Sequence, residues 1–266
     1  MTGDKAGKDY WSNLWEKETL PLSINPLGKG LNNFVSQNFS EYFKGCFKGM
    51  NTESASLLEI GCARSVWLPY FAREFGFHVS GLDYSETGCK LTRLILKRNN
   101  VEGKIYHCDL FNPPHEVLES FDVVISFGVV EHFDDTKACI KACSRFLVPS
   151  GIMITSIPNM VGLNGRIQKL CDRTVYDIHY PIDRETLKCA HTSAGLEVIS
   201  CDYFLLANFG VINLEGLQGK PYYKILIRLR SWTSKFFWLI GRIVHLPSPN
   251  RWTSPYINCM VMKPCD

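Results

Sequence analysis

The sequence predicts an α/β fold in which a doubly wound, mainly parallel sheet is covered by helices. Three observations support this prediction. Short, nearly continuous apolar runs recur along the chain, as expected for strands buried on both faces. Stretches with helical spacing of apolar residues separate these runs. Between residues 56 and 85, a strand, a glycine turn, a helix, a second strand and an acidic residue follow one another, which is half of a nucleotide-binding unit.

The glycine turn sits at the end of the first of these strands. Residues 57–60 form an apolar run that breaks at Gly61. Glycine permits a sharp turn, and we expect it to bring backbone N–H groups close to a ligand, beside the positive end of a helix dipole. A helical pattern follows, and Ser65 is placed to cap it. A second strand at 78–82 leads to Asp83, near the ~20-residue offset at which an acid accepts hydrogen bonds from ribose hydroxyls.

Two nucleoside ligands fit this pattern, a dinucleotide and S-adenosylmethionine (SAM). A dinucleotide site is expected to carry Gly-x-Gly-x-x-Gly, so that the backbone can approach a pyrophosphate. Residues 61–66 read Gly-Cys-Ala-Arg-Ser-Val, with a glycine at only the first of the three positions. The turn therefore disfavours a pyrophosphate, and with it a nicotinamide-dependent oxidoreductase.

Five motifs in order resemble those of the class I SAM-dependent methyltransferases. The first, Glu59-x-Gly61-x-Ala63-x-Ser65, is similar to Glu/Asp-x-Gly-x-Gly-x-Gly with small residues in place of the last two glycines. The others are Asp83, Cys108-Asp109-Leu110, the run 121–128 followed by Val130-Glu131-His132-Phe133, and Pro149-Ser150-Gly151. The resemblance covers roughly residues 50–203 and the last strand.

This resemblance implies a Rossmann-like methyltransferase fold, with a seven-stranded mixed sheet in the order 3-2-1-4-5-7-6 and helical cap insertions. It implies SAM as the cofactor, with Asp83 on the ribose and with Asp109 and Leu110 around the adenine. The other cofactor contacts that we expect are Glu59, Tyr84, the backbone of Gly61, Cys62 and Ala63, Gly128 near the methionine part, and Tyr10 and Trp11 in a lid.

Composition limits the number of domains, the kinds of partner and the cellular compartment that we expect. With 266 residues, 45% of them hydrophobic, the chain can form one large domain or one domain and a cap. A net charge of +3 is too small to indicate a nucleic acid as partner. The eleven cysteines are an odd number, lie scattered in apolar segments and accompany no recognisable signal peptide. We therefore expect reduced thiols and a cytoplasmic location.

The chain is expected to divide into a helical lid (1–50), a SAM-binding core (51–203), an inserted helical substrate cap (204–253) and the last core strand (254–266). Residues 1–9 are polar and expected to be disordered. Along the chain, further helices are expected at 32–47, 85–99, 134–147 and 183–194. Further strands are expected at 104–107, 121–127, 152–157, 196–203 and 256–263.

Two stretches exceed the basic fold, a cap loop at 159–181 and the insertion at 204–253. Segments this long in a compact domain are usually functional or have structure of their own. Basic and aromatic residues interleave between 221 and 245. Two interpretations remain open for that stretch, a pair of cap helices packed on the core or a weak contact with a membrane surface. Its apolar run at 236–240 is too short to span a bilayer.

The expected chemistry is an in-line displacement at a sulfonium, for which the protein mainly positions the acceptor. A hydroxyl acceptor needs a base, and His132 is the candidate, with His179 as a second one. Glu131 and His132 also resemble the Glu-His pair of ubiquinone-type O-methyltransferases, in which a glutamate three residues upstream helps to hold a divalent ion. That position is Gly128 here, so we expect no metal.

The sequence thus predicts a SAM-dependent methyltransferase that acts on a small molecule, with oxygen slightly favoured over nitrogen because of His132. Two alternatives stay open. One is an N-methyltransferase that relies on positioning without a base. The other is a non-catalytic SAM-binding or membrane-surface protein.

Overall fold

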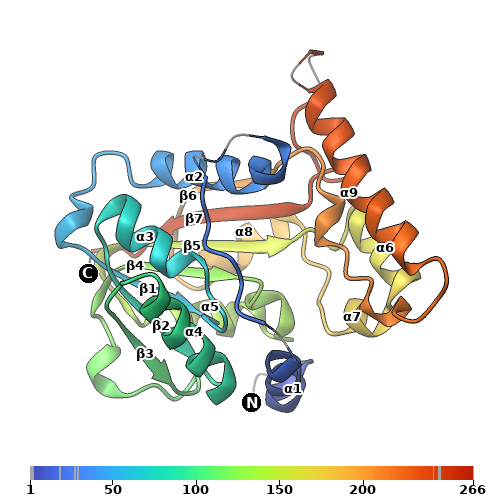
Figure 1. Ribbon diagram of the computed structural model, residues 1–266. Coiled ribbons are helices and arrows are strands. Elements are labelled where there is room, and N and C mark those ends of the chain that lie inside the picture. The colour runs from blue at the N-terminus through green and yellow to red at the C-terminus, as the bar shows by residue number, and fades with distance from the viewer. Residues whose placement is uncertain are drawn as a thin grey trace.

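The computed structural model describes residues 3–17, 19–26, 28, 30–241, 243–244 and 247–265. A seven-stranded sheet runs through its centre, and helices cover both faces of that sheet (Figure 1). The strands are β1 (Ser56–Ile60), β2 (His78–Asp83), β3 (Gly103–His107), β4 (Phe121–Phe127), β5 (Leu147–Pro158), β6 (Glu197–Phe204) and β7 (Tyr256–Met262). Their order is β3-β2-β1-β4-β5-β7-β6, and only the two pairs that include β7 are antiparallel. The predicted doubly wound, mixed sheet and its strand order are confirmed.

The helices among the described residues are α1 (Gly7–Lys17), α2 (Phe34–Cys46), α3 (Trp67–Phe75), α4 (Glu86–Arg98), α5 (Thr136–Ser144), α6 (Leu163–Cys171), α7 (Arg173–Asp177), α8 (Arg184–Ser193) and α9 (Tyr223–Ile240). Helices α2, α3 and α4 pack on one face of the sheet and α5 and α8 on the other, while α6, α7 and α9 lie beside it (Figure 1). Phe43 of α2 belongs to the same hydrophobic cluster as Leu57 of β1. Ile140 of α5 and Leu187 of α8 belong to another, with Leu58. Adjacent strand residues therefore bury on opposite faces, which explains the continuous apolar runs.

One helix ends earlier than its sequence pattern suggests. The helix expected at 134–147 is α5, which ends at Ser144. Leu147 already pairs with Phe121 of β4 and so begins β5, which is correspondingly longer than the expected strand at 152–157. Pairing in the sheet thus prevails over the apolar spacing that continues the helical pattern.

The N-terminal residues are ordered, contrary to the expected disorder of residues 1–9. The Gly3 N–H donates to Asp134 Oδ1 (3.0 Å), and the Lys5 N–H donates to the His132 carbonyl oxygen (2.9 Å). Asp4 forms an isolated antiparallel bridge with Phe133. Residues 1 and 2 lie outside the described residues. The polar composition of this segment misled the prediction, because backbone hydrogen bonds rather than apolar burial hold it.

Both insertions leave the sheet at one edge. β5 ends at Pro158 and β6 at Phe204, and each of these residues pairs with Tyr256 at the start of β7. The first insertion forms α6 and α7. The second holds, among its described residues, two short 3₁₀ turns and the single long helix α9, not the expected pair of helices. Residues 242 and 245 of the stretch considered for membrane contact lie outside the described residues. Of the helices described, none is long and apolar enough to cross a membrane.

A buried histidine joins α8 to the sheet. The Nδ1 of His191 lies 2.8 Å from the Leu187 carbonyl oxygen, and its Nε2 lies 3.0 Å from the Thr155 hydroxyl of β5. A carbonyl can only accept, so Nδ1 carries the proton and the Thr155 hydroxyl donates to Nε2. Burial lowers the pKa of His191 to about 4, so the ring is neutral at pH 7.

The substitution His191→Gln is expected to reduce the loss of stability in acid. The unfolded chain binds a proton at this residue near pH 6.5, whereas the folded chain does so only near pH 4. Between these values the unfolded state binds more protons, so acid lowers the free energy of unfolding. Between pH 7 and pH 4 the wild type is expected to lose about 3 kcal/mol more than the variant, as measured by urea unfolding. The exposed His78→Gln is the control, and parallel curves for wild type and His191→Gln would contradict the assignment.

Candidate active site

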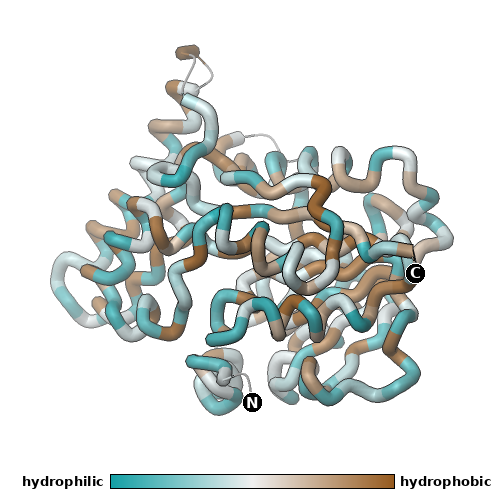
Figure 2. Tube along the Cα trace, turned by 180° about the vertical axis from the view of Figure 1, so that it is seen from behind, coloured by the Kyte–Doolittle hydropathy of each residue, from teal (hydrophilic) through white to brown (hydrophobic). Residues whose placement is uncertain are grey.

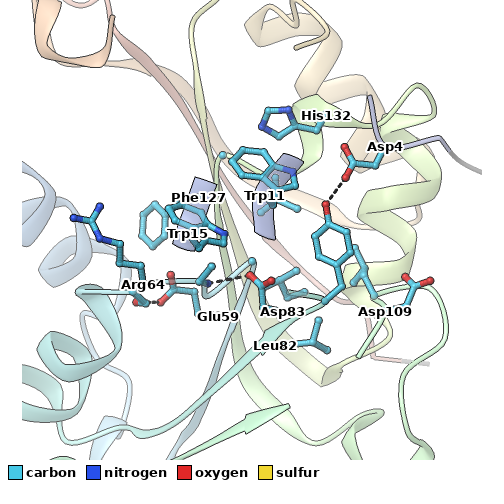
Figure 3. A pocket seen from close by; sticks show the side chains of 18 of the residues that line it. Asp4, Trp11, Trp15, Glu59, Arg64, Leu82, Asp83, Asp109, Phe127 and His132 are labelled. Carbon is cyan, nitrogen blue, oxygen red and sulfur yellow. Dashed lines mark hydrogen bonds between the residues drawn. The ribbon is translucent and has the colours of Figure 1, made fainter. Parts of the chain in front are cut away.

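A cavity of about 430 Å³ opens at the carboxyl ends of β1, β2 and β4. Its volume lies within the ~300–1,000 Å³ that is usual for small-molecule sites. Figure 3 shows acidic side chains from the strand ends on one side of it, with Trp11 and Trp15 of α1 across from them. The expected lid helix therefore does border the cavity. The two indole rings stack, with centroids 5.9 Å apart.

The turn after β1 is fixed by the end of β2. The N–H groups of Gly61 and Cys62 both donate to the Leu82 carbonyl oxygen, at 2.8 and 3.2 Å. The Ala63 N–H donates to Asp83 Oδ2 at 3.0 Å. All three N–H groups are thus engaged within the protein, and a contact between them and a ligand stays a prediction. A pyrophosphate would need such donors, whereas SAM carries no phosphate, so the turn suits SAM better than a dinucleotide.

Asp83 is a buried acid on the cavity wall. Burial raises the pKa of Asp83 to about 6, against hydrogen bonds donated by the N–H groups of Ser85 and Ala63. Above pH 6 the side chain is therefore a carboxylate. Each oxygen already accepts one backbone N–H and retains a second lone pair for a ligand hydroxyl.

Glu59 of β1 holds the far end of the same turn through a hydrogen bond with Ser65. The Ser65 hydroxyl donates to Glu59 Oε2 at 2.5 Å and accepts the N–H groups of Trp67 and Leu68, both at 3.1 Å. Ser65 thus caps α3 as its position predicts. Burial raises the pKa of Glu59 to about 8, so its carboxyl is protonated at pH 7.

The 3₁₀ turn η4 (Val130–His132) carries the histidine at the other end of the cavity. Nδ1 of His132 lies 2.8 Å from the Ile178 carbonyl oxygen, which follows α7. The His179 ring lies beside it, with centroids 4.5 Å apart, and its Nδ1 lies 2.6 Å from the Val175 carbonyl oxygen. Burial lowers the pKa of His132, and it lowers that of His179 to about 4. Both rings are neutral at pH 7, with the proton on Nδ1.

Glu131 is the third member of this group. Among the described residues, neither of its carboxyl oxygens has a hydrogen-bond partner, and burial raises the pKa of Glu131 to about 8. Its Oε1 lies 4.0 Å from His132 Nε2. One ligand atom from each of Glu131, His132 and His179 lies within 4.8 Å of the others, a spacing that could hold a metal ion. The position three residues before Glu131, where the related enzymes carry a further glutamate, is Gly128 here. The expectation of no metal stays a prediction.

The cavity gathers most of the residues singled out from the sequence. Those that line it are Trp11, Glu59, Gly61, Ala63, Asp83, Tyr84, Asp109, Leu110, Gly128 and His132. Glu131 and His179 lie next to His132 but do not line the cavity. Tyr10 packs its ring against Trp11 at 5.1 Å and is not part of the lining. Cys62 is also absent from it, because its side chain lies under Gly81 of β2.

Several lining residues escaped the sequence prediction. They include Asp4, Trp15, Arg64, Trp67 and Phe127. Trp15 follows Trp11 by four residues, so helical spacing could have placed both on one face. Asp4 accepts a hydrogen bond from the Tyr84 hydroxyl at 2.5 Å, a contact across 80 residues that no local pattern announces.

The cavity and the sheet agree with comparisons to known proteins. Residues 30–201 match the family model of a methyltransferase domain. The chain belongs to this methyltransferase family. The expected class I family, its Rossmann-like fold and SAM as its cofactor are thereby confirmed.

The sequence relatives match only part of the chain, whereas solved structures match nearly all of it at low sequence identity. A ubiquinone biosynthesis O-methyltransferase of Neisseria meningitidis is 32% identical over 108 residues, which cover 39% of this chain and 44% of the relative. The chain spans 44% to 61% of the length of three such relatives. The Streptomyces coelicolor geranyl diphosphate C-methyltransferase has a TM-score of 0.62 at 12% identity, over 96% of this chain and 97% of that one. A Haemonchus contortus phosphoethanolamine N-methyltransferase bound to SAM has a TM-score of 0.59 at 18% identity, over 98% of this chain and 59% of that one.

The substitution Gly61→Ala is expected to disturb the turn more than a glycine change elsewhere. The φ angle of Gly61 is +71°, and a Cβ there would lie 2.5 Å from Val129 Cγ2. Gly195→Ala is the matched control, since its φ is +89° and no atom lies within 4 Å of the added Cβ. Both variants bear the cost of positive φ, about 1 kcal/mol, but only Gly61→Ala adds a clash. We expect it to lose at least about 1 kcal/mol more in urea unfolding. Equal losses would contradict the close approach.

Proposed function

We propose that the protein transfers the methyl group of SAM to a hydroxyl oxygen of a small-molecule acceptor, with His132 as general base. SAM, when bound, supplies an electrophilic methyl carbon on its sulfonium. The observation that carries the proposal is the state of His132, a neutral ring on the cavity wall whose Nδ1 is engaged by a backbone carbonyl. The lone pair for accepting a proton is therefore on Nε2.

The surroundings of His132 support this role. Trp11 covers one side of the ring, edge to face at 5.1 Å, and His179 lies on another. These contacts exclude water and restrict the ring to one orientation. Glu131 and His179 act as positioning residues in this proposal, since neither lines the cavity. An acceptor hydroxyl that reaches Nε2 would lose its proton there as the oxygen attacks the methyl carbon.

The proposed cofactor contacts follow the cavity wall from β2 to β4. Asp83 accepts the ribose hydroxyls, Asp109 and Leu110 border the adenine, and Gly128 faces the methionine part. In support, all four residues line one cavity that ends at His132. Gly61 and Ala63 offer a small surface rather than donors, and Trp11 and Tyr84 close the other side. Tyr10 and Cys62 have no direct contact in this proposal. Residues 3–17 serve as the lid in this proposal, instead of the expected 1–50, because α2 packs on the sheet. The insertions at 159–181 and 204–253 serve as caps.

N-methylation by positioning alone is the competing proposal. A neutral amine attacks the methyl carbon without prior loss of a proton, so it gains little from a base. The buried, unprotonated ring of His132 favours oxygen. The two proposals differ in whether the rate depends on the protonation of His132.

The substitution Asp83→Ala is expected to abolish measurable SAM binding, because two ribose hydroxyls lose their acceptor. For the wild type, affinity is expected to weaken as pH falls below about 6, where Asp83 takes up a proton. Calorimetric titration with SAM between pH 5 and pH 8 measures both effects, and NADH is expected not to bind. Asp83→Asn keeps the shape of the side chain and removes its charge, and it is titrated beside Asp83→Ala. Thermal unfolding verifies that both variants are folded. Unchanged SAM affinity in a folded variant would remove the ribose assignment.

The substitution His132→Gln is expected to lower kcat by about 10²- to 10⁴-fold without changing the Kd of SAM. The wild-type rate should fall as pH drops through the lowered pKa of His132, because the protonated ring cannot accept a proton. Formation of demethylated SAM with a panel of phenols, carboxylic acids and amines measures the rate.

Chelation separates this mechanism from metal catalysis. After dialysis against EDTA, we expect the wild-type rate to be unchanged. A loss that Mg²⁺ restores would assign Glu131, His132 and His179 as metal ligands instead. Full activity of His132→Gln at every pH would leave the histidine without a role as base.

A further inference from the structure

A row of hydrophobic side chains lies exposed along α9. Its members are Ile225, Leu229, Trp232, Phe236, Leu239 and Ile243. They follow one another at alternating spacings of four and three residues, which places them on one side of the helix and of the turn after it. The exposed fraction runs from 49% for Leu239 to 80% for Ile243, with 75% for Trp232. A contiguous row of this kind marks an interaction surface rather than a scattered surface residue.

The opposite side of α9 holds the helix to the protein. The Ser234 hydroxyl accepts the Phe209 N–H at 2.9 Å, and the Trp238 indole N–H donates to the Ala207 carbonyl oxygen at 2.5 Å. The Trp238 ring also stacks on Phe34, with centroids 4.7 Å apart. These contacts fix which side of α9 faces the protein, so the exposed row on the other side faces solvent. The helix stands out from the body of the molecule in both views (Figures 1 and 2).

The sequence that contains this row carries charge of one sign. Residues 216–251 contain no acidic residue and seven basic ones, Lys220, Lys224, Arg228, Arg230, Lys235, Arg242 and Arg251. The whole chain has a net charge of only +3, so its remaining residues carry more acidic than basic side chains. Lys224, Arg228 and Lys235 each precede a residue of the row, and thus flank it on one side.

We propose that α9 docks the protein on an anionic lipid bilayer, with the exposed row entering the interface and the flanking basic residues meeting lipid headgroups. Helices that lie in a membrane surface combine an apolar face containing Trp and Phe with Lys and Arg beside it. A second copy of the chain would also fit the spacing, but it would bring basic residues against basic residues. Anionic lipid supplies the charge that this region lacks.

Docking at α9 goes beyond the proposed methyl transfer and does not depend on it. The insertion that contains α9 and the cavity both lie at the carboxyl edge of the parallel strands.

Co-sedimentation of the full chain with vesicles tests the proposal. The protein is expected to pellet with vesicles of phosphatidylcholine mixed with phosphatidylglycerol, and much less with phosphatidylcholine alone. Trp232→Ser combined with Phe236→Ser should lower the partition coefficient at least about tenfold. Leu22→Ser, at an 89% exposed leucine outside α9, is the control and should change nothing.

The charged residues are tested separately. Lys224→Gln combined with Arg228→Gln should lower binding to the phosphatidylglycerol vesicles at least about tenfold. The matched control is Lys137→Gln with Lys141→Gln, an exposed pair at the same spacing on α5. Thermal unfolding and SAM titration verify that each variant is folded.

Two results would overturn the proposal. One is equal vesicle binding by the wild type and the Trp232→Ser/Phe236→Ser variant. The other is a wild-type dimer in sedimentation velocity that this variant abolishes, which would make a second copy the occupant of the row.

Discussion

The site depends on how one carbonyl oxygen, that of Leu82, holds the turn after β1. Parallel pairing of Ile60 with Leu82 brings the two strand ends level, and the next two N–H groups of the chain then converge on that oxygen. Asp83 takes the third N–H, from Ala63. With these backbone donors engaged, Gly61 and Ala63 present a small surface to the cavity, beside the side chain of Arg64. Asp83 remains beside the turn as an anion above pH 6.

A second constraint acts on the turn that carries His132. The N–H of Lys5, in the N-terminal segment, donates to the His132 carbonyl oxygen. The N–H of Tyr180, in the first insertion, donates to the Glu131 carbonyl oxygen at 2.7 Å. The imidazole is held by Ile178 from that same insertion. Segments far apart in sequence thus meet on two consecutive residues, Glu131 and His132. Since these bonds come from lid and cap, the orientation of the ring depends on both being in place.

The parts predicted well are those that local physics determines. Buried strands and their glycine turn leave a clear apolar pattern, so β1, β2 and the positions of Gly61 and Asp83 could be predicted from sequence. The order of strands came from a family resemblance. Contacts between distant segments leave no such pattern, which is why the docking of Asp4 at Tyr84 was missed. The same applies to Tyr10, whose aromatic character predicts burial but not the direction in which its ring points.

Burial also sorts the charges in the site. Buried carboxyls at Glu59 and Glu131 have raised pKa values, and buried rings at His132 and His179 have lowered ones. At pH 7 all four groups are neutral, whereas Asp83 is ionised. A cationic sulfonium would be repelled by a protonated histidine, and it would lose stabilisation if the reacting end held a fixed cation. Among these five groups, the negative charge lies at the end proposed for the nucleoside, and an uncharged proton acceptor lies at the reacting end. Methyl transfer to a hydroxyl benefits from this arrangement, because an uncharged imidazole can accept the acceptor's proton and an imidazolium cannot.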